Sequence, residues 1–162
     1  MLKVKLILPR KPYLDSRIET YQEKYKDDVI QIVRNFHGEA VGEYDNIFDV
    51  EALAQTIEDN AQNHHNCFLL ILDGRAEGML FGATFKSLIN GKDIFQEIVW
   101  YVNEPYRRYG VKLLKDVQNI LQSRGVNIMI MAVLENSKTS KLKSFYEKMG
   151  FKLMESHFVR SL

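Results

Sequence analysis

A short basic run that contains a proline and a glycine is the part of the sequence best suited to chemistry. It reads VNEPYRRYGVKLL over residues 102–114. Backbone amides at a helix N-terminus donate hydrogen bonds to anions, and glycine lets that backbone approach a phosphate closely. Arg107 and Arg108 can add charge-assisted hydrogen bonds. The run therefore predicts a turn that binds a diphosphate. A plain solvated helix start is the alternative interpretation.

A carboxylate inside an apolar stretch is the second candidate. Glu97 interrupts the run 94–102, which is otherwise rich in large apolar residues. An amine must lose a proton before it attacks an acyl group, and a carboxylate can accept that proton. Simple strand alternation places Glu97, Val99 and Tyr101 on one face, although a bulge would change this. A solvent-facing Glu97 is the alternative.

The elements that would position these groups follow from the apolar periodicity. Asp49 is suited to cap a helix that begins at Val50, and Asp73-Gly74 indicates a hairpin. Helices are expected at 27–36, from 50 through Ile57, at 113–121 and at 142–149, the last two ended by Gly125 and Gly150. Strands are expected at 2–8, 17–22, 67–72, 79–85, 94–102, 128–134 and 151–159. The strands at 67–102 should form an antiparallel meander, and a crossover helix should make 94–102 and 128–134 parallel.

The bulk composition is that of a soluble globular protein. The chain has 162 residues, 46% hydrophobic and 27% charged, so we expect a single domain over 1–162. A net charge of +1 gives no general attraction to nucleic acid or membranes. One cysteine, Cys67, excludes an internal disulfide, and the adjacent His64 and His65 make a poor metal site, so no metal is expected. The short, lysine-broken N-terminal apolar stretch favours a cytoplasmic protein.

This element order and two motifs resemble the GNAT superfamily of N-acetyltransferases, especially the small stand-alone proteins of bacteria and phages. The run 102–114 resembles the coenzyme A signature V-x-P-x-x-[RQ]-x-x-G-x-[GA]-x-x-L, with Lys112 in place of the usual glycine or alanine. The segment SFYEKMGFK over 144–152 is similar to the family's second motif. The resemblance implies an α/β (α+β) GNAT fold: a mixed sheet with an antiparallel N-terminal meander, about four flanking helices and splayed central strands.

The resemblance also implies roles for particular residues. Acetyl-CoA would be the co-substrate and an amine the acceptor, with Tyr146 protonating the departing thiolate and Glu97 accepting the amine proton. The acceptor would contact His37, Glu39 and Tyr44, which lie in the polar stretch between the first two helices. The coenzyme contacts implied are Tyr101, Val102, Arg107, Arg108, Tyr109, Gly110, Val111, Lys112 and, more weakly, Asn136.

Alternatives remain open at this point. Tyr146 could be a core aromatic residue, and Thr139 or Ser140 is expected to cap its helix. Lys112 raises the alternative of an inactive GNAT-fold protein with a binding or structural role, for example in an assembled particle. A nucleic-acid-binding role for the cluster of Arg107, Arg108, Lys112 and Lys115 is disfavoured by the balanced net charge. A homodimer through the final strand is possible by the same resemblance.

Overall fold

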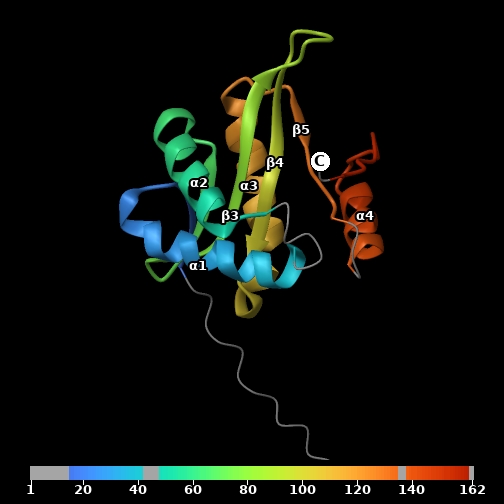
Figure 1. Ribbon diagram of the computed structural model, residues 1–162. Helices are drawn as coiled ribbons and strands as arrows, with labels where there is room; N and C mark the ends of the chain where they lie inside the picture. Colours follow the sequence, from blue (N-terminus) through green and yellow to red (C-terminus); the bar gives the residue numbers. More distant parts are fainter. Residues whose placement is uncertain (1–14, 42–47, 135–137, 161–162) are drawn as a thin grey trace, which may run out of the picture.

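The computed structural model describes residues 15–41, 48–134 and 138–160. Within these ranges it contains four α-helices, as the sequence predicts, and a five-stranded sheet (Figure 1). The strands are β1 (Ser16–Thr20), β2 (Cys67–Leu72), β3 (Arg75–Lys86), β4 (Asp93–Val102) and β5 (Ile128–Ile130). The helices are α1 (Lys26–Phe36), α2 (Val50–His64), α3 (Gly110–Ser123) and α4 (Thr139–Lys148). The expected strand 2–8 lies outside the described residues.

The sheet is mixed, and its central strands separate. The strand order is β1-β2-β3-β4-β5, antiparallel from β1 to β4 and parallel between β4 and β5. The parallel pairing covers only three positions, from Ile94 opposite Ile128 to Gln96 opposite Ile130. Beyond Gln96 the two strands no longer pair, so the expected splay is confirmed. β5 is also shorter than the predicted strand 128–134.

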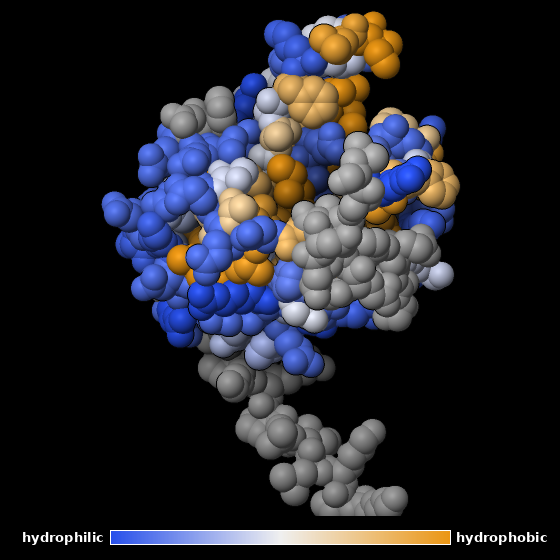
Figure 2. All heavy atoms as spheres, viewed as in Figure 1, coloured by the Kyte–Doolittle hydropathy of each residue, from blue (hydrophilic) through white to orange (hydrophobic). Residues whose placement is uncertain are grey.

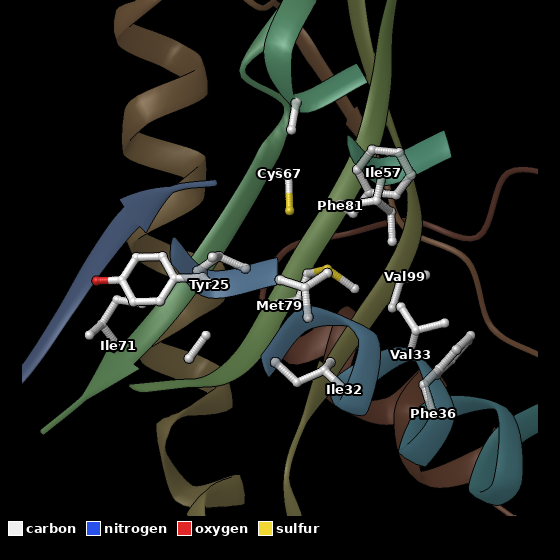
Figure 3. Packing of buried hydrophobic residues seen from close by; sticks show 14 of the residues in the cluster. Tyr25, Ile32, Val33, Phe36, Ile57, Cys67, Ile71, Met79, Phe81 and Val99 are labelled. Atoms are coloured by element: carbon white, nitrogen blue, oxygen red, sulfur yellow. The ribbon is translucent and has the colours of Figure 1, made fainter. Parts of the chain in front are cut away.

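Helices cover both faces of the sheet and enclose two apolar clusters. On one face, α1 and α2 pack against side chains such as Ile32, Phe81 and Val99 (Figure 3). On the other face, α3 contributes Leu113 and Leu114 to a cluster that also holds Phe95. These residues are almost completely buried. Each of the α1 and α3 faces that the periodicity predicts as apolar is therefore buried against the sheet.

A β-bulge in β4 corrects the simple alternation expected for that strand. Phe81 of β3 faces Val99, whereas Gly82 faces Glu97, so Ile98 is the extra residue. Val99 therefore joins the cluster under α1, out of phase with Glu97. Gly82 permits the bulge because a Cβ there would lie 2.3 Å from the Gln96 carbonyl oxygen. The bulge rotates the end of β4 relative to its start.

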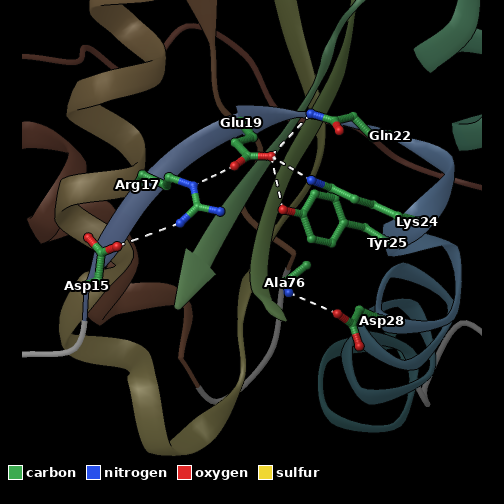
Figure 4. Close-up of polar contacts among 8 residues, drawn as sticks. All are labelled: Asp15, Arg17, Glu19, Gln22, Lys24, Tyr25, Asp28 and Ala76. Atoms are coloured by element: carbon green, nitrogen blue, oxygen red, sulfur yellow. Dashed lines mark hydrogen bonds and ion pairs between the residues drawn. The ribbon is translucent and has the colours of Figure 1, made fainter. Parts of the chain in front are cut away.

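Polar contacts fix the first helix to the sheet. Asp28, in the first turn of α1, accepts a hydrogen bond from the Ala76 amide at 2.9 Å (Figure 4). It accepts another from the Arg75 guanidinium at 2.8 Å. The Tyr25 hydroxyl donates to Glu19 of β1 at 3.0 Å. These contacts hold the N-terminal end of α1 beside the turn of the β2–β3 hairpin and next to β1.

The structure confirms the cap predicted for α2, whereas the cap predicted for α4 is wrong. Asp49 caps α2 as predicted, since its carboxylate accepts hydrogen bonds from the amides of Glu51 and Ala52, both at 2.9 Å. Neither Thr139 nor Ser140 caps α4. The helix begins directly at Thr139, whose hydroxyl donates to the Leu134 carbonyl at 3.0 Å instead. Lys138 occupies the N-cap position and Thr139 is already the first helical residue, so neither predicted residue stands where a side chain caps a helix.

The final strand predicted for 151–159 does not form within the described residues. Residues 151–160 have no regular secondary structure, although Gly150 ends α4 with the expected positive φ of 88°. A strand needs a partner, and β5 offers an edge of only three residues. Leu153 and Phe158 are consequently exposed. A second exposed apolar group, Leu88 and Ile89, forms the tip of the β3–β4 hairpin (Figure 2).

Candidate active site

Glu97 lies where β4 and β5 separate, and it turns toward the β5 side. Its Oε2 accepts a hydrogen bond from the Ala132 amide at 2.8 Å, and the side chain is 7% exposed. Burial raises the pKa of the Glu97 carboxyl to about 7, and hydrogen bonds from the Ala132 and Trp100 amides offset part of the rise. A carboxyl with such a pKa exchanges its proton readily near neutral pH. The solvent-facing alternative for Glu97 is therefore wrong.

Tyr146, on α4, approaches Ala132, the residue whose amide donates to Glu97. Its hydroxyl donates to the Ala132 carbonyl at 3.4 Å, a long hydrogen bond. The ring packs 5.8 Å from that of Trp100 and 5.5 Å from that of Phe151, and the residue is 7% exposed. Burial, and secondarily the charge of Glu97, raise the pKa of Tyr146, so the phenol stays protonated at neutral pH. Tyr146 is thus a buried aromatic that also holds a proton beside Glu97.

The glycine-containing turn is more tightly wound than the sequence predicts. A 3₁₀-helix, η4 (Glu104–Tyr109), leads directly into α3 at Gly110. The Tyr106 amide donates to the Asn103 carbonyl at 2.9 Å, and the Gly110 amide donates to the Arg107 carbonyl. These two amides are therefore engaged within the turn itself. Gly110 itself is buried against Trp100 and Val102.

Each basic side chain of this turn has a different partner. Arg107 forms an ion pair with Glu39, and Arg108 lies 5.0 Å from the centre of the Tyr109 ring. Lys112 forms an ion pair with Asp116, one helical turn further along α3. The Lys112 ammonium is thus held beside the body of α3. The other predicted coenzyme contacts, Val102, Tyr109 and Val111, comprise two core residues and one that is 39% exposed.

Glu39 connects the predicted acceptor side to the predicted coenzyme side. It lies in a π-helical turn, η2 (His37–Val41), that continues α1. Its carboxylate accepts a hydrogen bond from the Tyr101 hydroxyl at 2.9 Å and forms ion pairs with Arg107 and Lys138. Desolvation raises the pKa of Glu39. Hydrogen bonds from Lys138 and Tyr101, together with the charge of Arg107, lower the pKa by more than desolvation raises it, so the net shift is downward.

A cavity of about 610 Å³ opens beside this cluster. Asn35 donates to the Asn103 side chain at 2.9 Å, and Asn103 donates to Glu77 at 2.8 Å, so a chain of hydrogen bonds crosses its wall. The lining residues are Arg34, Asn35, Gly38, Glu39, Glu77, Tyr101, Asn103, Glu104, Pro105 and Tyr106. The lining carries three carboxylates and one guanidinium, so it is acidic.

The remaining predicted site residues do not join this arrangement. His37 borders a different crevice, next to Val33 and Val41 between α1 and α2. Tyr44 and Asn136 lie outside the described residues. Lys138 is a functional candidate that the sequence analysis missed, because it stands in a polar run with no regular spacing. Trp100 is another: its indole Nε1 is buried and has no hydrogen-bond partner among the described residues.

Other kinds of site find little support in the part of the chain that the structure describes. No three histidine, cysteine or acidic side chains lie close enough there to hold a metal ion. None of the described helices has the length and apolar character needed to cross a bilayer. Cys67 is fully buried, and burial raises the pKa of its thiol, which leaves it a core residue and not a nucleophile.

The comparison with protein families decides the assignment. The model of the Acetyltransferase (GNAT) family matches residues 17–151. The chain belongs to this family. The match begins in β1 and ends just after α4, so it includes Glu97, Tyr146 and the whole basic turn of this GNAT protein.

Solved structures support the fold. A possible acetyltransferase from Clostridium difficile 630 superposes with a TM-score of 0.72 at 15% identity, covering 93% of this chain and 98% of that one. An aminoglycoside acetyltransferase from an uncultured soil metagenomic sample gives 0.66 at 21% identity, with 91% and 96% covered. A ribosomal-protein-alanine N-acetyltransferase from Brucella melitensis biovar Abortus 2308 gives 0.68 at 12%, with 91% and 99% covered. No curated protein matches the sequence.

The residues around the splay can be tested for their fit to the family's co-substrate, acetyl-CoA. Beyond Gln96 the edge of β4 that faces β5 has no strand partner among the described residues, and the buried Trp100 indole offers an unused donor beside Gly110. A Cβ at Gly110 would make only ordinary contacts, the shorter being 3.7 Å to Trp100, so packing within the chain does not require glycine there. Arg107 and Arg108 supply positive charge at the same end. These features fit a phosphorylated thioester.

Proposed function

We propose that this GNAT protein acts over residues 1–162 as one N-acetyltransferase domain that uses acetyl-CoA to acetylate an amine. The observation that carries the proposal is the meeting of Glu97 and Tyr146 at Ala132. One side chain hydrogen-bonds the amide of that residue and the other its carbonyl. A proton acceptor and a proton donor thus stand together at the point where the sheet opens.

The division of roles follows from the two pKa shifts. When bound, acetyl-CoA supplies an acetyl group that is activated as a thioester. Glu97, with a pKa of about 7, accepts a proton from the ammonium form of the acceptor and leaves the amine nucleophilic. Tyr146 holds a proton on its hydroxyl and donates it to the departing sulfur. Because burial raises the pKa of Tyr146, its hydroxyl gives up a proton less readily than an exposed phenol. Burial also disfavours the thiolate anion, which makes the departing sulfur a stronger base and so favours proton transfer from Tyr146.

The acceptor side is served by the acidic cavity. Glu39 is already paired with Arg107 and Lys138, but Glu77 and Glu104 still outnumber the single Arg34, so the lining attracts a cation. A primary amine is an ammonium ion near neutral pH, and a second ammonium on the same molecule could bind here while the first reaches the splay. The named relatives acetylate amines of different classes, so they do not single out an acceptor.

Thermal unfolding with and without acetyl-CoA tests the first half of the proposal. A ligand that binds only the folded chain stabilises it by RT ln(1 + [L]/Kd), so Tm rises with the logarithm of the ligand concentration above Kd. We expect an upward shift with acetyl-CoA. No shift at millimolar ligand contradicts the proposal and favours a noncatalytic binding or structural role.

Release of free thiol from acetyl-CoA in the presence of amines tests the second half. The panel should include polyamines, aminoglycosides, amino acids, peptide N-termini and protein lysines. Turnover with at least one amine above the rate of hydrolysis supports the proposal. Binding of acetyl-CoA without transfer to any class would leave a coenzyme-binding protein and remove the assigned roles of Glu97 and Tyr146.

A further inference from the structure

Three donors from separate parts of the chain converge on the Glu39 carboxylate. Oε2 accepts from the Tyr101 hydroxyl at 2.9 Å and also contacts Arg107, while Oε1 contacts Lys138. Tyr101 belongs to β4, Arg107 to η4, and Lys138 immediately precedes α4. Two cations and a phenol around one anion are the composition of an anion-binding site. Its present occupant is a side chain of the same protein.

The donors match a phosphate as well as they match a carboxylate. A guanidinium and an ammonium are the side chains that proteins use most for phosphate recognition. Arg107 belongs to the basic turn that a diphosphate would approach, because it lies three residues before the N-terminus of α3. Its Nη2 is engaged with Glu39, so a phosphate that uses this nitrogen must displace the carboxylate.

The surroundings permit such a displacement. Glu39 sits in the η2 turn, and π-helical turns are rare and concentrate at functional sites. Its side chain is 29% exposed and lines the 610 Å³ cavity, so the carboxylate has room to move away from the cations. The pKa of Glu39 is lowered, so the carboxylate is ionised at neutral pH and competes with other anions.

We propose that Tyr101, Arg107 and Lys138 form a subsite for the diphosphate of coenzyme A, and that Glu39 occupies this subsite as an internal competitor until the diphosphate displaces it. The inference rests on the proposed function and adds Lys138 to the binding residues. When the diphosphate replaces the Glu39 carboxylate, two negative charges take the place of one, and the charges of Arg107 and Lys138 balance those of the diphosphate. Coenzyme affinity is consequently lower than the cations alone would allow.

Isothermal titration with the wild-type chain and the Glu39→Gln variant tests the competition. Glutamine keeps the size of the side chain and removes the charge. Because both ion pairs of Glu39 are partly exposed and therefore weak, removing its charge should tighten acetyl-CoA binding about threefold to tenfold. Dephospho-coenzyme A should show the same gain, since it keeps the diphosphate and lacks only the 3′-phosphate. Acetylpantetheine, which has neither group, should show none.

Two further variants serve as control and confirmation. Glu58→Gln breaks a comparable ion pair with Lys26, at 2.9 Å at the other end of α1, and should leave the Kd for acetyl-CoA unchanged. Lys138→Met, which removes an exposed ammonium with little effect on packing, should weaken acetyl-CoA binding about threefold to tenfold in the Glu39→Gln background. Circular dichroism of each variant confirms that it is folded.

The outcomes separate this inference from the function on which it rests. If acetyl-CoA binds the wild type and Glu39→Gln equally well, the competition is refuted and the proposed function stands. The diphosphate assignment is refuted if acetylpantetheine gains as much affinity as acetyl-CoA. If no variant binds acetyl-CoA, both proposals fail together.

Discussion

Two glutamates of this protein have opposite surroundings, and their pKa values move in opposite directions. Glu97 is 7% exposed and is bonded to backbone amides, and burial raises its pKa to about 7. Glu39 is partly exposed and bonded to two cations and a phenol, and its pKa is lowered. Burial without a cation makes a carboxyl that exchanges its proton near neutral pH, whereas paired cations make a permanent anion. Only Glu97 is therefore suited to act as a base.

The largest effect should come from removing that base. Glu97→Gln should lower kcat by about 10²–10⁴-fold, the range typical of general-base removal, while the Kd for acetyl-CoA stays within about twofold. In the wild type, kcat/KM should rise as the pH increases through about 7, because the carboxylate is the active form. That rising limb should be absent in Glu97→Gln. Steady-state rates across pH measure both.

A matched control for this result is Glu19→Gln. Glu19 also accepts a hydrogen bond, from Tyr25 at 3.0 Å, but lies on β1 at the opposite edge of the sheet from β5. Its loss should leave kcat within about twofold. An unchanged pH profile in Glu97→Gln would exclude Glu97 as the base, whatever the size of the fall in rate.

Tyr146→Phe should have the next largest effect. Loss of the donated proton should lower kcat about 100-fold with little change in the Kd for acetyl-CoA, since the ring and its contacts with Trp100 and Phe151 remain. Tyr25→Phe removes another buried hydroxyl far from the splay and should leave kcat unchanged. Equal turnover of Tyr146→Phe and the wild type would mean that Tyr146 only packs.

How much of this contrast the sequence could predict depends on the range of the interactions. The sheet order, α1, α2 with its Asp49 cap, and the candidates Glu97 and Tyr146 follow from local periodicity and from motifs. The Ala132 contact that brings those two side chains together does not, because it joins positions 35 and 14 residues apart across the splay. The bulge at Ile98 likewise depends on pairing with β3, where Gly82 has no Cβ.

The Glu39 cluster was beyond sequence reasoning for the same cause. Its ion pairs join Glu39 to residues 68 and 99 positions away. Lys138 stands in a polar run, and no spacing in the sequence relates it to Glu39. The predicted strand 151–159 failed in the opposite manner: its apolar residues suit a strand, but pairing requires a neighbour that β5, three residues long, does not offer.

The buried Glu97 carboxyl should make the free energy of unfolding depend on pH. The pKa of Glu97 is about 7 in the folded chain against an ordinary value of 4.5, so the folded state holds the proton more tightly than the unfolded state. Its stabilising contribution is complete below the ordinary value and is lost as the pH rises through about 7. From about pH 5 to 8, the wild type should lose about 1–3 kcal/mol of unfolding free energy relative to Glu97→Gln. Urea titrations of both proteins measure this difference, and parallel curves would contradict it.

The smallest effect should come from the stability of Glu39→Gln. The partners of Glu39 are 43% and 50% exposed, so its ion pairs should contribute only about 0.2–1 kcal/mol at low salt. Screening should remove most of that contribution at about 1 M salt, because the Debye length falls to about 3 Å. Urea titrations at low and high salt measure it, with Glu97→Gln as the comparison whose difference from wild type should not depend on salt. A salt-independent loss above about 2 kcal/mol in Glu39→Gln would show that Glu39 acts as a buried group, and the contrast between the two glutamates would then be lost.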